Sequence, residues 1–468
     1  MRDLFKKYCQ FDRIDASGRR YRTTTEHLVV DEGAPQEIIA WIAARWDTPH
    51  VMIVADELTF SLVGRDLRDR LERAALPVST YLVQPPPGHS IPLCDQPTIE
   101  ALQGAMIEAR PDAVLAVGAG TINDCAKMAA HRAGRPYLCF ATAPSMNGFT
   151  SSIAAILEAG IKTTQPCDPP VAVFATPSMM ADAPYRMIAS GFGDLLSKPV
   201  SNADWALSAA LLGTEHSSIV MEIVDQAQQL LEGVAARLPD RDHDAIARLT
   251  GALFLSGLGM QAAGSSGPAS GGEHLISHYI DMTAYAFGLA HDFHGCQVAV
   301  GTLTTSWLYD QLRLRDPKTI DPDARAAAWP TWEVYRETLD QRFGPLVHAV
   351  EAHAVRAYPT PDALHARLTR IRHMWPRLWD SVSSTLWGEV RLREELERAA
   401  VPTTFQEIGV EPARAWRSIV HSKDIRARYT VLHLAAELGW LDDLADAYLG
   451  GRPDSAKEPA PRTFASEA

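Results

Sequence analysis

The first third of the chain alternates short apolar runs with longer amphipathic stretches. The apolar runs are continuous, as is typical of strands that are buried on both faces of a parallel sheet. Because strand and helix alternate, we expect an open α/β sheet with parallel strands. The predicted strands are Val51–Ala55, Val78–Val83, Ala113–Val117 and Tyr137–Thr142, and the predicted helices are about Pro35–Trp46, Leu58–Ala75, Thr98–Arg110 and Ile122–Ala133.

The pattern changes after about residue 176. Strand-like runs become scarce there, and helical periodicity dominates to about Tyr448. The last residues are rich in Pro, Ser, Ala and charge, a composition typical of disordered segments. We therefore expect an α/β domain over residues 1–176, an all-α domain over residues 177–449 and a disordered tail over residues 450–468.

Charge and composition narrow the class of protein. The 468 residues carry a net charge of −13 that is spread along the chain, which argues against binding to nucleic acid or to an anionic membrane. A local pocket could still bind a small anion. The N-terminus is too polar for a secretory signal, and we find no apolar run of about 18 residues that would form an integral membrane segment. Six scattered cysteines without a CxxC pair favour a reducing, cytoplasmic setting.

A histidine-rich stretch between residues 271 and 302 carries the strongest chemical signal. His274 and His278 are four residues apart in an apolar-periodic run, so on a helix they share one face. His294 opens a second helical run after a loop-like gap. Two imidazoles and one carboxylate would form a three-ligand metal site with an open position, which is the pattern of catalytic zinc.

The carboxylate has a candidate upstream. Asp194 follows two glycines, and Lys198 comes four residues later on the same helical face. A helix cap and a surface ion pair would use the same residues. The intervening Leu195 and Leu196 favour a buried turn, so together with the histidines we favour a functional role.

Two features of the α/β domain suggest a dinucleotide. Gly118-Ala119-Gly120-Thr121 lies where a strand passes into a helix, where glycines and helix amides can hold a pyrophosphate. The motif lacks the full GxGxxG pattern, and a purely structural turn would use the same glycines. Asp56 ends the first clear strand, where a carboxylate can bind the adenosine ribose and disfavour a 2′-phosphate. A helix N-cap is the alternative role for Asp56.

Several longer motifs together resemble the sn-glycerol-1-phosphate dehydrogenase family. That family belongs to the superfamily of dehydroquinate synthases, glycerol dehydrogenases and iron-type alcohol dehydrogenases. The resemblance implies their fold, a Rossmann-like N-terminal domain with a parallel sheet followed by an all-α domain for metal and substrate. The motifs are VGAGTINDCAK (117–127), FATAPSMNGFTSS (140–152), APYRMIASGFGDLLSKPVSNADW (183–205), GGEHLISHYIDM (271–282), HGCQVAVGT (294–302) and EIGVEPARAW with RARYTVLHLAAELGWL (within 407–441).

The resemblance assigns roles to individual residues. It implies that Asp194, His274 and His294 bind one divalent metal, with zinc as our first expectation and nickel or iron as alternatives. His278 would lie close to the substrate and to proton transfer, and Lys198 would face the substrate pocket. Residues expected to bind NAD(H) or NADP(H) are Asp56, Gly118, Gly120, Thr121 and Asp124 around the pyrophosphate and adenosine, and Thr142, Ser145, Asn147, Ser151 and Ser152 in the loop below the nicotinamide.

Departures from the family pattern bear on the substrate. Asn147 stands where the family has an aspartate, and it keeps hydrogen-bonding capacity but loses the charge. The strand that starts at Val171 also lacks a family aspartate, and the chain has extra length between about 312 and 400, a segment rich in Trp and Arg.

The expected activity is metal-dependent, NAD(P)H-linked reduction of a small phosphorylated ketone, dihydroxyacetone phosphate, to sn-glycerol 1-phosphate. Alternatives are a related alcohol or polyol dehydrogenase, a lyase of the dehydroquinate-synthase type, and a metal- and nucleotide-binding module without turnover. Beyond the small substrate, we expect homo-oligomers and no nucleic-acid partner.

Overall fold

The chain folds as two compact units in a computed structural model, which describes residues 1–158 and 161–453. The sheet unit holds Met1–Leu195 and Ser217–Ser266, and the helical unit holds Leu196–His216 and the chain from Gly267 onward. The two units interleave along the sequence, so no single boundary separates them. Separate roles for residues 1–176 and 177–449 therefore stay a prediction.

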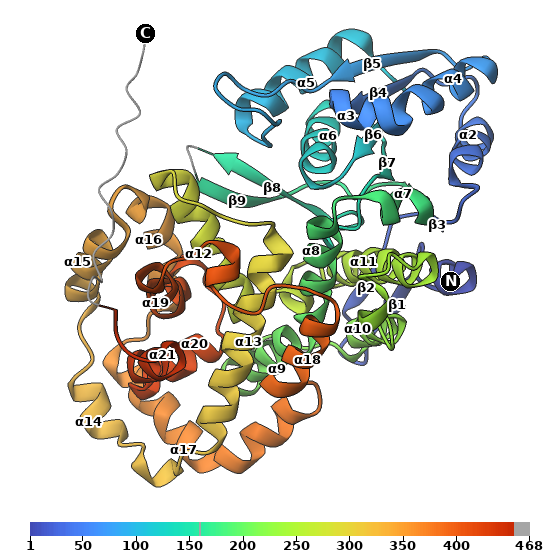
Figure 1. Cartoon of the computed structure of the whole chain (residues 1–468). Helices are drawn as coiled ribbons and strands as arrows, with labels where there is room; N and C mark the ends of the chain where they lie inside the picture. Colours follow the sequence, from blue (N-terminus) through green and yellow to red (C-terminus); the bar gives the residue numbers. More distant parts are fainter. Residues whose placement is uncertain (159–160, 454–468) are drawn as a thin grey trace. The chain divides into compact units, whose positions relative to one another are not determined.

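The sheet unit contains the elements of the alternating N-terminal pattern and several later helices (Figure 1). In chain order they are α1 (Arg2–Tyr8), β1 (Asp12–Ile14), β2 (Arg20–Arg22), β3 (His27–Val30), α2 (Ala34–Arg45), β4 (Val51–Ala55), α3 (Glu57–Thr59), a π-helical turn (Phe60–Gly64), α4 (Arg65–Arg73), β5 (Val78–Leu82), α5 (Gln96–Ala109), β6 (Ala113–Gly118), α6 (Gly120–Ala133), β7 (Tyr137–Ala141), β8 (Ile153–Glu158), β9 (Ile161–Pro166), β10 (Ala172–Ala175), α7 (Pro177–Asp182), α8 (Tyr185–Leu196), α10 (Ser218–Leu230) and α11 (His243–Ala263).

A six-stranded sheet in the order β3-β10-β7-β6-β4-β5 forms the centre of this unit, and its neighbouring strands are parallel. The expected parallel α/β sheet is thereby confirmed. β4, β6, β7 and β10 are buried along their whole length, which explains their unbroken apolar sequences. Ile38 of α2 and Leu67 of α4 join Phe174 of β10 in one continuous hydrophobic core.

The strand order places the two candidate dinucleotide motifs at one edge of the sheet. From β4 the chain passes to β5 on one side and then to β6 on the other, so the order reverses between β4 and β6. Ligands of such sheets bind beyond the carboxyl ends of the strands at this switch point. Asp56 directly follows β4, and Gly118 ends β6.

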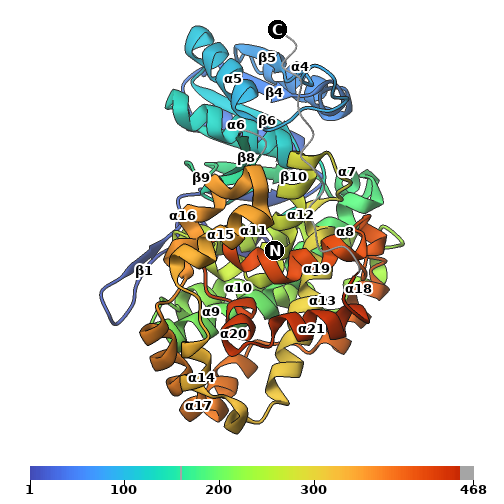
Figure 2. The same ribbon diagram turned by 90° about the vertical axis from the view of Figure 1, so that its left-hand side faces the viewer.

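Five strands lie outside the predictions. β1 and β2 have three residues each and form an antiparallel pair. β3 has only four residues and pairs with β10, far along the chain. β8 and β9 form an antiparallel hairpin, and β8 lies beside α6 (Figure 2). The predicted helix at about 58–75 contains the π-helical turn, where a Cβ on Gly64 would lie 2.7 Å from a ring carbon of Phe60.

The helical unit contains helices and no β-strand among its described residues. It comprises α9 (Lys198–Leu212), α12 (Gly272–Phe287), α13 (His294–Arg313), α14 (Pro322–Ala327), α15 (Trp332–Phe343), α16 (Val347–Ala357), α17 (Pro361–Ser383), α18 (Glu389–Arg398), α19 (Pro412–His421), α20 (Val431–Leu438) and α21 (Leu441–Leu449). α12 and α13 pack closely, because a Cβ on Gly301 would lie 2.6 Å from the carbonyl oxygen of Glu273.

The expected tail over 450–468 falls outside the described residues from 454 onward. Gly450 ends α21 with a φ of +78°, a left-handed conformation that favours glycine. The Arg452 guanidinium then donates a hydrogen bond of 3.2 Å to Asp446.

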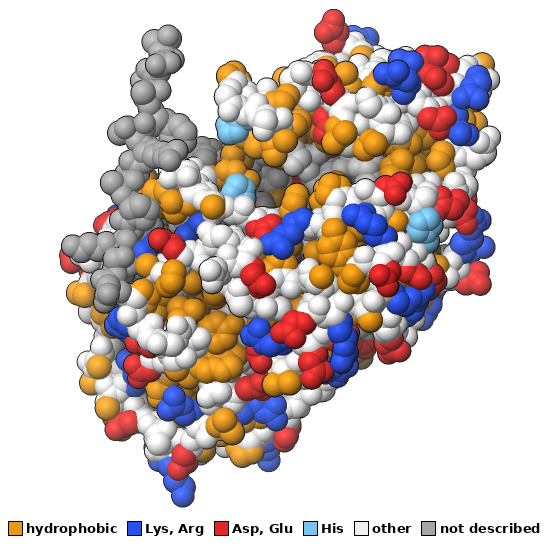
Figure 3. All heavy atoms as spheres, viewed as in Figure 1, with side chains coloured by type: hydrophobic (Ala, Val, Ile, Leu, Met, Phe, Trp, Pro, Cys, Tyr) orange, Lys and Arg blue, Asp and Glu red, His pale blue; other side chains and the backbone are white. Residues whose placement is uncertain are grey.

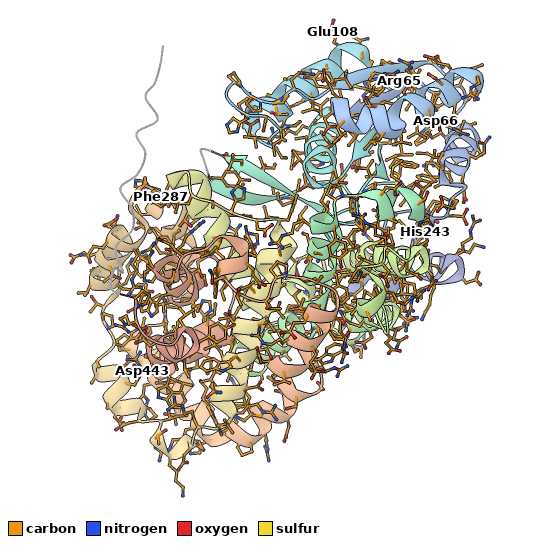
Figure 4. All side chains as sticks on the ribbon, viewed as in Figure 1. Arg65, Asp66, Glu108, His243, Phe287 and Asp443 are labelled. Carbon is orange, nitrogen blue, oxygen red and sulfur yellow. The ribbon has the colours of Figure 1, made fainter. Side chains whose placement is uncertain are left out.

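The surface agrees with the spread charge of the sequence. Lys and Arg side chains are interspersed with Asp and Glu on the face shown in Figure 3. Charged residues such as Arg65 of α4 and Glu108 of α5 are exposed (Figure 4). Leu67 of α4 is buried in the hydrophobic core. Over the ranges 1–158 and 161–453, none of the helices has the length and apolarity needed to cross a membrane.

Candidate active site

The three histidines of the sequence signal come together in the helical unit. His274 and His278 lie on α12, and His294 is the first residue of α13. Ring centroids are 5.2 Å apart for His274 and His294, 5.5 Å for His278 and His294, and 6.2 Å for His274 and His278. His274 is buried and the other two are half-buried. His291, which matches no expected ligand, is exposed and packs its ring 5.1 Å from that of Tyr285.

His274 is oriented by a carboxylate. Its Nδ1 lies 2.7 Å from Oε1 of the fully buried Glu273, and the same oxygen accepts a 2.7 Å hydrogen bond from the Gly271 amide. Because a carboxylate accepts, the His274 Nδ1 carries the proton and its Nε2 presents a lone pair. This is the tautomer that a metal ligand needs, and carboxylates commonly hold metal-binding histidines in this way.

A second buried carboxylate lies near Glu273. Asp204 of α9 accepts hydrogen bonds from the Gly272 amide at 2.7 Å and from the Tyr309 hydroxyl at 2.6 Å. Burial, and then the nearby charge of Glu273, raise the pKa of Asp204 to about 7. A Cβ on Gly271 would lie within 2.8 Å of oxygens from both carboxylates, so only glycine fits there.

His294 is held by a hydroxyl. Its Nδ1 lies 3.1 Å from Oγ of Ser277, which in turn donates a 3.0 Å hydrogen bond to Oε1 of Gln297. Both partners are fully buried between α12 and α13. The two imidazoles that could bind a metal are therefore both contacted at Nδ1.

Asp194 lies in the sheet unit, near the end of α8, and it is fully buried. The Asn147 main-chain amide donates a 2.9 Å hydrogen bond to one carboxylate oxygen, and the Asn147 side-chain amide donates a 3.0 Å bond to the other. Asn147, which we expected to bind the cofactor, thus contacts the candidate metal ligand. An aspartate at 147 could not donate the second bond.

Two glycines let helices approach the loop that carries Asn147. A Cβ on Gly191 of α8 would lie 1.8 Å from the carbonyl oxygen of Pro144, and a Cβ on Gly257 of α11 would lie 2.0 Å from the hydroxyl of Thr150. Any larger residue would push these helices away from the loop. The expected helix entry before Asp194 is wrong, because α8 begins at Tyr185, and Gly191 of the motif is needed for packing within the helix.

Lys198 begins α9 in the helical unit and is fully buried. Its ammonium donates hydrogen bonds to the Ala269 carbonyl at 3.0 Å and to the Ser197 hydroxyl at 3.2 Å. The lysine therefore places a positively charged group in the segment that precedes α12. Such a charge suits an anionic substrate group.

Asp56 caps a helix, which is the alternative that the sequence allowed for it. It is the N-cap of α3, and its carboxylate accepts a 2.7 Å hydrogen bond from the Thr59 amide and a 2.8 Å bond from the Thr59 hydroxyl. The Asp56 amide donates to that same hydroxyl, which completes a capping box. A ribose contact stays a prediction that this cap neither requires nor supports.

The glycine turn has the expected geometry. Gly118 ends β6, Gly120 begins α6, and Thr121 is exposed in its first turn. A Cβ on Gly118 would lie 2.6 Å from Cβ of Ile122, so only a glycine at residue 118 allows so tight a turn from β6 into α6. The first amides of α6 consequently face the switch point of the sheet, where a pyrophosphate would be stabilised.

Asp124 ties α6 to neighbouring structure. Its carboxylate accepts a 3.1 Å hydrogen bond from the Ala155 amide of β8 and a 2.8 Å bond from the Asn123 side chain. The ammonium of Lys127, one turn further along, lies 3.7 Å from Asp124. Asp124 therefore connects the glycine-turn helix to the β8–β9 hairpin.

The sequence motif contained Lys127, but we assigned it no role. Its fully buried ammonium donates hydrogen bonds to the Gly148 carbonyl at 2.7 Å, the Ile153 carbonyl at 3.1 Å and the Ser151 hydroxyl at 3.4 Å. These contacts hold the second half of the loop expected below the nicotinamide and its junction with β8. The spacing of Asp124 and Lys127, three residues apart in the helix after the glycine turn, was the signal that could have revealed it.

The remaining residues of the loop differ in their hydrogen bonds and in their burial. Thr142 follows β7, and its amide donates a 3.2 Å hydrogen bond to the Gly118 carbonyl, which joins the loop to the glycine turn. The Ser145 carbonyl accepts a 2.8 Å bond from Ser190 of α8. The Ser151 hydroxyl is buried against main-chain carbonyls, whereas Ser152 is only half-buried. Ser152 is thus the more accessible of the two serines.

Comparison with known proteins agrees with this architecture. The family described as iron-containing alcohol dehydrogenase matches residues 29–184. A glycerol-1-phosphate dehydrogenase [NAD(P)+] from Bacillus velezensis is 34% identical over 328 residues, which cover 69% of this chain and 81% of that protein. The chain belongs to the glycerol-1-phosphate dehydrogenase family. Another protein of that name, from Bacillus licheniformis, is 29% identical over 90% of this chain and 91% of its own length.

Solved structures show that this glycerol-1-phosphate dehydrogenase family member shares the fold of glycerol dehydrogenases. Glycerol dehydrogenase from Schizosaccharomyces pombe aligns with a TM-score of 0.59 at 17% identity, covering 96% of this chain and 98% of its own. A probable glycerol dehydrogenase from Sinorhizobium meliloti aligns with a TM-score of 0.57 at 18% identity, covering 90% and 98%. The fold expected from the sequence resemblance is confirmed.

Proposed function

We propose that the protein reduces dihydroxyacetone phosphate to sn-glycerol 1-phosphate with NADH or NADPH, at a divalent metal held by Asp194, His274 and His294. The observation that carries the proposal is that both imidazoles of the proposed site are contacted at Nδ1. Their Nδ1 atoms contact Glu273 and Ser277, so each imidazole can offer Nε2 to a metal. Membership of the family and the names of its relatives support the substrate and cofactor classes.

The donor set fits the proposed metal. One carboxylate and two imidazoles are borderline-hard ligands that suit zinc, and they leave coordination positions for substrate. Zinc is therefore the metal we propose, ahead of nickel or iron. When bound, such a cation polarises the substrate carbonyl as a Lewis acid.

The chain's own residues would handle the charge and the proton. The Lys198 ammonium would bind the phosphate group of the substrate, since a positively charged donor suits a phosphate and the family resemblance places this lysine at the substrate pocket. His278 would return a proton to the oxygen of the reduced carbonyl, because its ring lies beside those of His274 and His294 and is half-buried.

The sheet unit would bind the dinucleotide that supplies the hydride. The first turn of α6, with Gly118, Gly120 and Thr121, would hold the pyrophosphate, and the loop with Thr142, Ser145 and Ser152 would lie near the nicotinamide. A chain of this composition would act in the cytoplasm, and we expect a homo-oligomer.

A substrate panel tests the proposal. Zinc-loaded protein with measured metal content is mixed with NADH or NADPH and a series of ketones, and absorbance at the nicotinamide band is followed. We expect oxidation with dihydroxyacetone phosphate and little with dihydroxyacetone, which lacks the phosphate. Preference for an unphosphorylated ketone would indicate a related alcohol or polyol dehydrogenase. Formation of a lyase product from a sugar phosphate without net oxidation of the nicotinamide would indicate the synthase-like alternative.

Ligand variants separate catalysis from folding. Asp194→Ala, His274→Ala and His294→Ala should each lose zinc and turnover together. The matched control is His291→Ala, which removes an exposed histidine from the same segment and should keep both. Full turnover in zinc-free His274→Ala would refute the proposed metal site.

A further inference from the structure

We infer that Ser277 and Gln297 are positioning residues that set the tautomer and the ring orientation of His294. The inference rests on the proposed function, because it assigns a role toward the proposed metal ligand. Neither residue was among the candidates from the sequence. Both are fully buried, one on each of the two helices that carry the histidines.

Two acceptors determine the orientation of the Gln297 side-chain amide. Its side-chain nitrogen lies 2.9 Å from Oδ1 of Asp281 and 2.8 Å from the main-chain carbonyl oxygen of Asp292. A carbonyl oxygen can only accept, so the NH2 group must face this pair and the amide oxygen must face away. The reversed amide would place its oxygen against two acceptors.

The Ser277 hydroxyl follows from that orientation. Oε1 of Gln297 accepts only, so the single hydroxyl proton of Ser277 is donated to it across 3.0 Å. The remaining contact of the hydroxyl, 3.1 Å to Nδ1 of His294, then requires that the imidazole N–H donates. The proton of His294 is thereby fixed on Nδ1, and Nε2 holds the lone pair.

The two proposed imidazole ligands are consequently held by different devices. Glu273 contacts His274 directly through its carboxyl group, whereas His294 is reached through a neutral hydroxyl and an amide. The Asp281–Gln297–Ser277 relay also joins the loop before α13 to α12 through the Asp292 carbonyl. The relay therefore holds the start of α13, where His294 lies, as well as its ring.

Zinc titration of the full-length protein against a chromophoric chelator tests the relay. Removing an outer partner of a metal-binding histidine weakens metal affinity by about tenfold to a hundredfold, and we expect this loss for Ser277→Ala and for Gln297→Leu. If Gln297→Leu does not fold, Gln297→Glu keeps the size of the side chain but loses both donated hydrogen bonds, and the same weakening is expected.

A matched control and a double variant distinguish positioning from general destabilisation. Thr302→Val also removes a buried hydroxyl that bonds within α13, and it should lower the melting temperature as Ser277→Ala does while leaving zinc affinity within about twofold of the parent protein. Because both changes break one relay, Ser277→Ala combined with Gln297→Leu should weaken zinc binding no more than the larger single change does.

The possible outcomes distinguish failure of the relay from failure of the proposed metal site. If the parent protein binds zinc and Ser277→Ala binds it equally tightly, or if the two losses add, the relay is refuted and the metal site stands. If the parent protein binds no zinc, the proposed metal site is refuted, and the role of the relay with it.

Discussion

Replacing Lys127 with methionine should loosen the loop between β7 and β8 without changing the sheet beneath it. Methionine has similar length and is apolar, so the change removes the ammonium but fills most of its space. The ammonium donates to the Gly148 and Ile153 carbonyls and to the Ser151 hydroxyl, and it pairs with Asp124 at 3.7 Å.

The expected cost follows from these contacts. Three hydrogen bonds from a charged donor contribute about 1.5–3 kcal/mol each, so their gross loss is about 5–9 kcal/mol. Removing a fully buried ammonium also removes its desolvation penalty of several kcal/mol. The hydroxyl of Ser151 can still donate to one of the two carbonyls. We therefore expect a net loss of about 3 kcal/mol in the free energy of unfolding.

Urea unfolding and NADH titration measure the two consequences. If about half of the loss is passed on to cofactor binding, the Kd for NADH should rise about tenfold. Lys6→Met, an exposed lysine on α1, is the control that should change neither quantity. Unchanged urea midpoint and unchanged Kd in Lys127→Met would refute the view that this ammonium holds the loop.

Two further changes probe charge in each unit. Asn147→Asp replaces an amide that donates to Asp194 at 3.0 Å by a second carboxylate, so the zinc-free variant should unfold about 1–3 kcal/mol more easily. Added zinc should raise its melting temperature more than that of the parent protein, and equal melting temperatures without zinc would contradict the expectation. Burial, and then the positive charge of Arg342, lower the pKa of His421 to about 3. Because the unfolded imidazole takes up its proton near pH 6.5, stability that is present above this pH is lost as the pH falls, by about 2 kcal/mol at pH 5. His421→Phe should remove that loss from the urea midpoints at pH 7 and pH 5, whereas the exposed His348→Phe should keep it.

The sequence predicts those parts of the fold that local pattern determines. β4, β6 and β7 are buried on both faces, so each appears as a continuous apolar run with nearly its observed ends. β3 escaped prediction because four residues are too few to show a pattern, and its place depends on pairing with β10. β8 alternates buried and half-buried residues because it lies in a two-stranded hairpin.

In the candidate site, too, local pattern predicts some features, and others depend on how the helices pack. The spacing of His274, His278 and His294 placed them on two helices and predicted that their rings would gather. The contacts at Nδ1 could not be predicted, because Ser277 reaches His294 only through the register of α12 against α13. At Asp56 the sequence allowed both a cap and a ribose contact, and only the structure shows the capping box.

Asn147 makes a contact that the family resemblance did not predict. The resemblance predicts that residue 147, where the family has an aspartate, lies near the nicotinamide and the substrate. In this chain both its amide groups donate to Asp194, so the substitution exchanges a repulsive neighbour for a donor to the proposed ligand. A cofactor contact of Asn147 stays a prediction.

The most direct test of the proposed function is analysis of the product. Zinc-loaded protein is incubated with dihydroxyacetone phosphate and NADH or NADPH, and the product is assayed for the configuration of its glycerol phosphate. We predict one nicotinamide oxidised for each sn-glycerol 1-phosphate formed, with no product in the His274→Ala variant. Formation of the 3-phosphate enantiomer, or turnover without nicotinamide oxidation, would contradict the account.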